Sequence, residues 1–582
     1  MLRTGEGDRK QMDKAEVSAV LEEIGTLLEL KGENPFKSRA YHNASRIIAG
    51  LDQDLGALVQ EKKLTTIKGI GEGLSENITI LYTTGRLPYY EDLQKSMPPG
   101  LLDMIRIQGV GPKRAKILYD QLKIKDIPGL EKAAKEGRIA QLEGFGEKSQ
   151  ENILKGLRFL SKHAEQHRYD EAWAAAEAVL AEMKKAPNVK RLSICGSLRR
   201  RREIIRDIDV LASAKNAKPV MDHFVKMPGV ERVLGEGDTK SSVLTKDGFQ
   251  VDLRVVDDAD YPFALHYFTG SKEHNIAVRH LANTKGLKLS EYGLFRHETQ
   301  RIPCKDETEL FKKLGMDYLP PEMREDRGEI DLALRHKVPK LIEPDDIRGA
   351  FHVHSTWSDG RAELEDMIAA AQGLGWEYVG ISDHSKSAAY AHGLSEDRVR
   401  QQGKAIEAFR KKFKIHIFWG TECDILKDGS LDYSDSVLAN YDFVIASVHS
   451  HFTLSEADMT RRITQALRNK YVTILGHLTG RLLLEREPYA VDPAEVLEVA
   501  AAEGVAVELN ASPHRFDIDW RMLPMAKEKG VKVSINPDAH SVPGLNVVPF
   551  GVGIARKGWL TKEDVINALP LKQITFWLRK RR

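Results

Sequence analysis

Cysteine is scarce in this sequence, and so are long apolar runs and any strong excess of charge. The only cysteines among the 582 residues are Cys195, Cys304 and Cys423, an odd and scattered set that suits reduced thiols better than a disulfide framework. No stretch approaches the roughly 20 apolar residues that a membrane helix needs. The first residues, MLRTGEGDRKQMDKAE, lack the apolar core of a secretory signal. We therefore expect a cytoplasmic protein without membrane attachment.

The charge is nearly balanced, and its distribution decides little. Residues 1–340 hold 57 Lys and Arg against 52 Asp and Glu, and residues 341–582 hold 30 against 33. This permits nucleic acid on the first part without requiring it. Because single domains usually stop growing at roughly 250–300 residues, a chain of this length is expected to form several domains.

One short pattern occurs three times near the amino terminus. It reads apolar-x-Gly-apolar-Gly before a helical stretch, as IKGIGEGLSENI from Ile67, IQGVGPKRAKIL from Ile107 and LEGFGEKSQENI from Leu142. The glycines permit a tight turn, and the amides at the next helix start attract a phosphate. One copy alone is equally consistent with an ordinary helix turn. The pattern resembles the helix-hairpin-helix motif, which grips the DNA backbone without reading sequence. We expect residues 1–165 to be almost wholly helical and to contact DNA through Gly69, Gly71, Gly109, Gly111, Gly144 and Gly146.

A pair of aspartates marks a candidate catalytic centre. In the predicted strand DIDVLAS, Asp207 and Asp209 share one face while Ile208 and Val210 are buried on the other. With Asp252, from the later strand GFQVDLRVV, they make an all-oxygen site suited to Mg²⁺ or Mn²⁺. Such a metal pair activates an attacking 3′-hydroxyl and stabilises the departing pyrophosphate. The outer phosphates are expected to lie on Gly196, Ser197 and Arg200.

This ordered set of motifs, continued by the run YFTGS from Tyr267, resembles a family X DNA polymerase over residues 10–325. The resemblance implies template-directed filling of short gaps from dNTPs, on gapped or nicked DNA, as in base excision repair. It implies that Arg254 orients the acids and that Arg279 touches the template minor groove. It also implies a sugar and base pocket lined by Tyr267, Phe268, Gly270 and Asn275. Taken alone, Tyr267 and Phe268 are equally consistent with core aromatics.

The sequence departs from the family pattern at three positions. Arg201 and Arg206 stand where small residues, often glycine, are common, and we expect them to alter phosphate grip or loop shape. Asn77 stands where some relatives carry a lysine that forms a Schiff base. Because an amide cannot form an imine, we predict no deoxyribose-phosphate lyase activity from that position.

Beyond residue 345, short β-rich runs alternate with helical segments, and nearly every run ends on a potential metal ligand. Functional residues of parallel α/β barrels gather at the carboxyl ends of the strands, so these side chains are expected to meet in one mouth. Imidazole and carboxylate ligands suit two or three Zn²⁺, Mn²⁺ or Fe²⁺ ions. Such ions generate a hydroxide that attacks phosphorus. Any one of these histidines alone is more often structural. The candidates are His352, His354, Asp359, His384, Glu422, His449, His477, Asp538 and His540.

Residues 345–575 resemble the PHP domain, named for polymerase and histidinol phosphatase, through HVHSTWSDG, ISDHS, GTE, SVHSH, GHLTGR and PDAH. The resemblance implies a distorted (β/α)₇ barrel with a trinuclear metal site. A family X polymerase followed by a PHP domain is a bacterial arrangement. It implies repair synthesis coupled to metal-dependent 3′–5′ exonuclease or 3′-end-processing activity.

The expected fold is multidomain, with helical helix-hairpin-helix domains, an α/β nucleotidyltransferase palm, a small thumb and the barrel. Two other functions stay open: a non-catalytic DNA-end-binding front half that delivers ends to the phosphoesterase, and a barrel acting as a small-molecule phosphatase. A monomer is sufficient for all three. The expected ranges are 1–97 for the first helix-hairpin-helix domain, 98–165 for a fingers-like region, 166–258 for the palm, 259–325 for the thumb, 326–345 for a linker and 346–582 for the PHP barrel.

Overall fold

The structure is a computed structural model that describes residues 12–579 apart from 50, 52–53, 106, 108, 164 and 298. The chain folds as two compact units, Met1–Ala164 and Glu165–Arg582. None of the helices in the described ranges combines the length and the apolar character needed to cross a membrane. The predicted boundaries between palm, thumb and barrel all fall inside the second unit and stay predictions.

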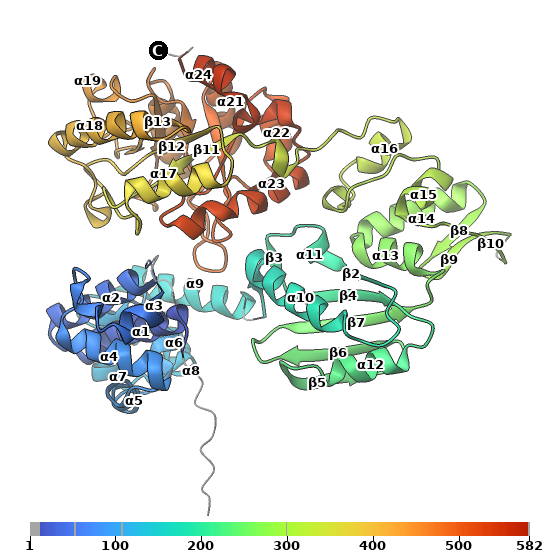
Figure 1. The fold of residues 1–582 in the computed structure, drawn as a ribbon, viewed down its shortest axis with the longest axis horizontal. Helices are drawn as coiled ribbons and strands as arrows, with labels where there is room; N and C mark the ends of the chain where they lie inside the picture. The colour runs from blue at the N-terminus through green and yellow to red at the C-terminus, as the bar shows by residue number, and fades with distance from the viewer. Residues whose placement is uncertain are drawn as a thin grey trace, which may run out of the picture. The chain divides into compact units, whose positions relative to one another are not determined.

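The first unit is helical, as the sequence predicts (Figure 1). Apolar side chains at helical spacing, such as Leu21, Ile24 and Leu28, are fully buried in one core. Side-chain caps set several helix starts: Asp54, for example, accepts a hydrogen bond from the amide of Ala57. The helices are α1 (Lys14–Lys31), α2 (Pro35–Ala49), α3 (Leu55–Gln60), α4 (Glu72–Thr84), α5 (Pro88–Lys95), α6 (Gly100–Met104), α7 (Pro112–Leu122), α8 (Ile127–Lys135) and α9 (Glu147–His163).

The second unit begins with a five-stranded mixed sheet in the order β2-β4-β7-β6-β5. β4 runs parallel to β7 at its centre, and the other neighbours are antiparallel. Ile208 and Val210 of β4 are buried, as its period-two pattern predicts. The elements are β1 (His167–Arg168), α10 (Tyr169–Met183), β2 (Arg191–Ile194), α11 (Gly196–Arg199), β3 (Ile204–Ile205), β4 (Asp207–Ser213), α12 (Lys218–Val225), β5 (Val230–Glu236), β6 (Lys240–Thr245) and β7 (Gln250–Val256).

A smaller α/β layer follows, and Figure 1 shows its helices beside the three-stranded antiparallel sheet β10-β9-β8. A charged stretch, residues 320–346, follows it. Its residues Arg324 and Glu329 are fully buried, although a charged run usually indicates a solvated surface. The elements are α13 (Tyr261–Thr269), α14 (Lys272–Thr284), β8 (Leu287–Ser290), β9 (Gly293–Arg296), β10 (Gln300–Ile302), α15 (Glu307–Lys313) and α16 (Glu329–Leu334).

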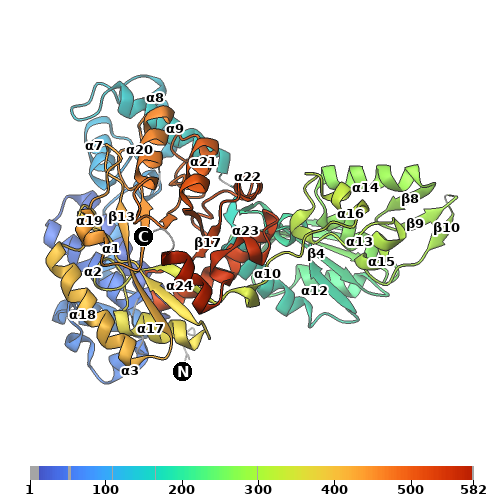
Figure 2. The same ribbon diagram turned by 90° about the horizontal axis from the view of Figure 1, so that it is seen from above.

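The last layer is the expected barrel of seven parallel strands in sequence order, β11 to β17, with helices outside it (Figure 2). Backbone hydrogen bonds close it: the amide of His354 donates to Ala539 O at 2.9 Å, and the amide of Ala539 donates to His352 O at 3.2 Å. The strands are β11 (Gly349–Val353), β12 (Tyr378–Ile381), β13 (His416–Asp424), β14 (Phe443–Ser447), β15 (Ile474–Leu475), β16 (Ala506–Asn510) and β17 (Val533–Asn536). The helices are α17 (Leu364–Gly373), α18 (Glu396–Lys412), α19 (Asp435–Leu438), α20 (Glu456–Leu467), α21 (Pro493–Glu503), α22 (Leu523–Glu528), α23 (Val548–Lys557) and α24 (Leu571–Arg579).

Candidate active sites

The three glycine turns of the first unit share a backbone conformation. The first glycine of each turn, Gly69, Gly109 or Gly144, has a φ between 80° and 98°, which favours glycine. In the first two turns the second glycine is the N-cap of α4 or α7 and makes no side-chain cap, so the helix-start amides stay available. An added Cβ at Gly71, Gly111, Gly144 or Gly146 meets nothing within 4 Å. The glycines therefore leave open surface at helix starts, where a phosphate backbone fits.

Asn77, the residue at the lyase position, is part of the same helical unit. Its side-chain amide donates a hydrogen bond to the hydroxyl of Tyr41 at 2.7 Å. The amide thus has a structural partner, and the absence of lyase chemistry at this position stays a prediction.

The sheet places the three predicted catalytic acids on neighbouring strands. Asp209 of β4 lies directly opposite Asp252 of β7, and Asp207 is two residues earlier on β4. Lys240, on β6, contacts Asp252 Oδ2 at 2.8 Å and so supplies a positive charge beside the triad. Burial, together with Asp207 and Asp252, raises the pKa of Asp209 to about 7. Three carboxylates sharing a face in this way call for a divalent cation.

Gly196 is required for this arrangement in a way that the sequence did not indicate. Its φ is 60°, and an added Cβ would stand 2.0 Å from Asp209 Oδ2. We expected the glycine to let a phosphate approach the backbone, but in the structure it also makes room for the Asp209 carboxylate. Ser197 is the next residue of the same short helix, α11.

Arg200 is the C-cap of α11 and has two partners in the smaller α/β layer and the stretch behind it. Its Nε lies 3.2 Å from Glu325 Oε1, and its NH1 donates to the carbonyl of Thr269 at 2.7 Å. The preceding Arg199, which the sequence analysis did not single out, pairs with Glu307 at 2.7 Å. Both arginines thus tie the predicted phosphate loop to the smaller α/β layer.

Arg201 adopts a φ of 58°, which explains why glycine is common at this position. Its guanidinium donates to the hydroxyl of Tyr169 at 2.6 Å and lies over the rings of Tyr169 and Trp173, 5.4 and 4.9 Å from their centroids. An added Cβ at Gly553 of α23 would meet the Arg201 side chain at 3.1 Å. Arg201 therefore packs between α10 and the barrel, whereas Arg206 is exposed.

The predicted sugar and base pocket is made from the end of α13 and the start of α14. The rings of Tyr267 and Phe268 meet edge to face at 5.1 Å. Asn275 is buried and donates to Tyr267 O at 2.6 Å, and an added Cβ at Gly270 would stand 2.7 Å from Asn275 Oδ1. The Nε of Arg279 donates to Asn275 O at 3.3 Å. Gly270 is thus needed for the close approach of Asn275.

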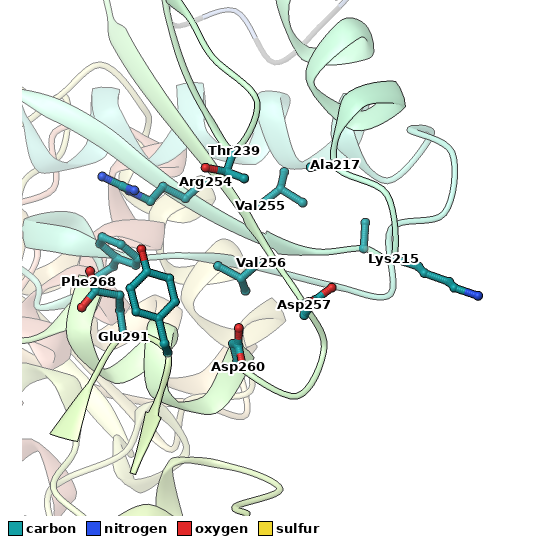
Figure 3. Close-up of a pocket in the computed structure, with 12 residues that line it drawn as sticks. Lys215, Ala217, Thr239, Arg254, Val255, Val256, Asp257, Asp260, Phe268 and Glu291 are labelled. Carbon is teal, nitrogen blue, oxygen red and sulfur yellow. The ribbon is translucent and has the colours of Figure 1, made fainter. Parts of the chain in front are cut away.

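A pocket of about 310 Å³ opens beside Phe268, which is one of its lining residues (Figure 3). Arg254 and Phe268 face each other at one end, with the guanidinium 4.8 Å from the ring centroid, and Lys215 points away at the other end. Asp257, Asp260 and Glu291 also line it. Arg254 follows Asp252 by two residues on β7, and Phe268 holds its guanidinium by a cation–π contact.

In the barrel, the nine predicted ligands come together at the carboxyl ends of the strands. Within the part of the chain that the structure describes, four groups of His, Asp and Glu have donor atoms within 4.8 Å of one another, and all four lie here. The palm acids are not among them. The four groups contain all nine residues: His354, Asp359, His384 and His540; His352, His354 and Asp538; His352, Glu422 and His477; and His384, Glu422 and His449.

Glu422 is the centre of this cluster. One of its oxygens, Oε1, lies 2.9 Å from His477 Nε2 and 3.2 Å from both His352 Nε2 and His449 Nε2. The other oxygen lies 3.0 Å from His384 Nδ1. Burial opposes ionisation of Glu422, but the positive charges of His352, His449 and His384 hold its pKa well below the usual range. A carboxylate surrounded by imidazoles in this way is suited to bridge cations.

The imidazoles have the properties of metal ligands. Both ring nitrogens of His354 are buried and have no oriented hydrogen bond within the described residues. Burial and the neighbouring His540 and His384 lower the pKa of His354 to about 3, so its ring is neutral near pH 7. For His352, burial is outweighed by Glu508, Asp538 and Glu422, which raise its pKa well above the usual range. A bound cation would displace that proton. The donor set therefore fits a cluster of divalent ions.

Two carboxylates behind the ligands were missed by the sequence analysis. Glu508 of β16 accepts a hydrogen bond from His352 Nδ1 at 2.5 Å and from the His477 amide at 2.8 Å. Asp424 of β13 lies 2.5 Å from His449 Nδ1. Both orient imidazoles that face the cluster. A sequence signal for them was available: an acidic residue inside a predicted buried strand, as in VAVELN. A buried carboxylate of this kind needs a hydrogen-bonding or charged partner.

Family models agree with this architecture along most of the chain. "Helix-hairpin-helix domain" matches residues 12–87, "SAM-like Helix-hairpin-helix tandem" 101–158, "DNA polymerase beta thumb" 264–325 and "PHP domain" 350–512. The "DNA polymerase/3'-5' exonuclease PolX" of Bacillus subtilis is 37% identical over 573 residues, which cover 98% of this chain and all of that protein.

Two other relatives each match one part of the chain. "DNA polymerase lambda" of Rattus norvegicus is 26% identical over 301 residues, 45% of this chain and 48% of that protein. A "Probable phosphatase" of Caldicellulosiruptor bescii is 30% identical over 205 residues, 32% of this chain and 78% of that protein.

Proposed function

Because this chain belongs to the PolX family, in which a family X DNA polymerase is joined to a PHP domain, we propose that it fills short gaps in damaged DNA and trims 3′ ends. Synthesis takes place in the palm, and a 3′–5′ exonuclease or end-processing reaction takes place in the barrel. The observation that carries this proposal is the presence of two separate candidate metal sites in one chain: the acids Asp207, Asp209 and Asp252 in the palm, and the nine-residue cluster of histidines and carboxylates in the barrel.

In the palm, Asp207, Asp209 and Asp252 hold the divalent ions, for which Mg²⁺ or Mn²⁺ is the natural choice. When bound, such ions lower the pKa of a 3′-hydroxyl and stabilise the departing pyrophosphate. Ser197, Arg200 and the backbone at Gly196 bind the outer phosphates of the dNTP. Asn275 and the aromatic pair of Tyr267 and Phe268 position its sugar and base, Arg254 orients the acids, and Arg279 reaches the template. The helix-hairpin-helix turns hold gapped or nicked DNA by its backbone.

In the barrel, the nine side chains hold two or three divalent ions, among which Zn²⁺, Mn²⁺ and Fe²⁺ suit the mixed nitrogen and oxygen donors. When bound, the ions supply a nucleophile by acidifying water. Glu508 and Asp424 keep His352 and His449 aimed at the cluster. Arg515, whose Nε lies 3.4 Å from Asp538 Oδ2, offers its buried NH1 to a substrate phosphate. Arg481, by contrast, is held by Asp519 and the carbonyls of Arg515 and Phe516.

A one-nucleotide gap with a labelled primer tests both activities in one product ladder, recorded with and without dNTPs. The double substitution Asp207→Ala/Asp209→Ala is expected to abolish extension and leave degradation intact. The double substitution His352→Ala/His354→Ala is expected to do the reverse. Extension that survives the first pair means that the palm assignment is wrong.

A small-molecule phosphatase activity of the barrel is a second candidate, favoured by the likeness to the protein named as a probable phosphatase. It predicts that free phosphate esters and DNA 3′ ends are hydrolysed equally well. A strong preference for DNA ends contradicts it. A monomer in the cytoplasm is sufficient for either function and stays a prediction.

A further inference from the structure

The barrel reaches into the predicted triphosphate site of the palm through one side chain, Lys557. This lysine ends α23, and its side chain is 0% exposed. Its Nζ donates to the backbone carbonyl of Arg200 at 3.0 Å and lies 2.5 Å from Glu325 Oε1. A lysine is seldom buried without paired charge, so these two contacts account for its position. Lys557 thus connects the barrel to the residue that we assign to the outer phosphates of the dNTP.

Glu325 is shared by three cations at this point. Oε1 contacts Lys557 and, at 3.2 Å, Arg200 Nε, while Oε2 lies 3.6 Å from Arg202 NH1. The Glu325 side chain is 10% exposed. Burial opposes ionisation, but Lys557 and Arg200 hold its pKa below the usual range. The carboxylate is therefore charged, and it competes with an incoming triphosphate for the Arg200 guanidinium.

Lys557 limits that competition because it binds the same oxygen as Arg200. Without the ammonium group of Lys557, the Glu325 carboxylate would pair with Arg200 and Arg202 alone. It would then bind Arg200 more strongly. The loop carbonyl of Arg200 would also lose its donor. Both changes would weaken the grip of Arg200 on phosphate.

We infer that Lys557 is a positioning residue for DNA synthesis: by neutralising Glu325 and fixing the loop carbonyl, the barrel keeps Arg200 available to the triphosphate of the dNTP. The inference rests on the proposed function of the palm and extends it, because it makes nucleotide affinity in the palm depend on a side chain of the exonuclease barrel.

Steady-state incorporation of one dNTP into a one-nucleotide gap, with Mg²⁺ and the full chain, tests the inference. Lys557→Met is expected to raise the KM for the dNTP roughly tenfold, the ratio that one charged hydrogen bond is worth, with a smaller effect on kcat. Glu325→Gln is expected to lower the KM, because it removes the competing carboxylate. The double variant is expected to return towards the native KM. A purely structural role predicts instead that both single variants impair the enzyme and that the double variant is worse.

Arg556→Met is the matched control. Arg556 precedes Lys557 on α23 and also joins the barrel to the segment before it, through Glu322 at 2.8 Å and Glu343 at 2.6 Å, but none of its contacts among the described residues is with the phosphate loop. Its KM should match that of the native enzyme, and exonuclease activity should report a folded barrel in every variant. A native KM in Lys557→Met, or a KM raised by Glu325→Gln, overturns the inference. A native protein that incorporates no dNTP overturns the proposed function itself.

Discussion

In the absence of divalent cations, the palm is expected to be less stable at neutral pH than at acid pH. Asp209 is the residue responsible, and substituting it tests the expectation. Its pKa rises from 3.8 to about 7 because of burial and the neighbouring Asp207 and Asp252. The folded state therefore binds this proton more tightly than the unfolded chain does. The contribution of Asp209 to stability is full below about pH 4 and is lost as the pH rises through 7. A difference of about 3 pKa units corresponds to on the order of 4 kcal/mol.

The substitution Asp209→Asn replaces the carboxylate by a neutral group of the same shape. In EDTA, we expect the variant to match the native protein near pH 4 and to exceed it at pH 8 by a few kcal/mol in the free energy of unfolding. Urea unfolding at both pH values, followed by circular dichroism, measures this. Added Mg²⁺ should narrow the difference at pH 8, because the cation stabilises the native triad.

Asp258→Asn is a control with the opposite sign. Arg191 and Ser213 hold the pKa of Asp258 below its usual value, so its contribution is present at neutral pH and is lost as the pH falls. Neutralising Asp258 should therefore lower the free energy of unfolding at pH 8. If Asp209→Asn is no more stable than the native protein at pH 8 in EDTA, the three acids do not repel one another as the strand register indicates.

Three further predictions follow from single contacts. Glu508→Gln should lower exonuclease kcat roughly 10- to 100-fold and leave primer extension unchanged, because Glu508 orients His352 and the His477 amide; a labelled primer with and without dNTPs measures both. Gly196→Ala should abolish extension and spare degradation, since the new Cβ would stand 2.0 Å from Asp209 Oδ2; normal extension would contradict the geometry of the triad. Arg201→Ala should cost about 1–3 kcal/mol of unfolding free energy in urea yet retain extension, because its contacts with Tyr169 and Trp173 are structural; loss of extension at normal stability would restore a role in phosphate binding.

Sequence reasoning worked best where side-chain direction follows from backbone periodicity. Asp207 and Asp209 share a strand face because the period of a strand is two residues, and β4 does bury Ile208 and Val210. The gathering of the nine candidate ligands in the barrel follows from a single rule, that parallel strands present their carboxyl ends at one mouth. In both cases a local sequence pattern determines which side chains come together in the fold. One sequence was therefore sufficient to predict that they lie close to one another.

The same reasoning failed where a charged residue is stabilised by a partner far along the chain. Glu508 lies 156 residues from His352, and nothing local marks it as the partner of that imidazole. Arg324 is fully buried against Glu307, although the charged stretch that contains it, residues 320–346, has the composition of a solvated segment. Burial of a charge depends on a partner that composition does not reveal.

At Arg201 a local backbone conformation and distant side-chain partners act together. This residue shows how a departure from a family motif should be interpreted. From the sequence, an arginine in place of glycine within a phosphate motif suggested altered phosphate binding, and so kept a non-catalytic front half open as a hypothesis. In the structure its φ of 58° preserves the turn that glycine usually makes, while its side chain packs on Tyr169, Trp173 and α23. The contacts with aromatic rings and a hydroxyl offset a backbone cost of about 1–3 kcal/mol. The departure is therefore compatible with catalysis, because the backbone shape of the motif is retained and the new side chain serves the palm–barrel interface that also holds Lys557.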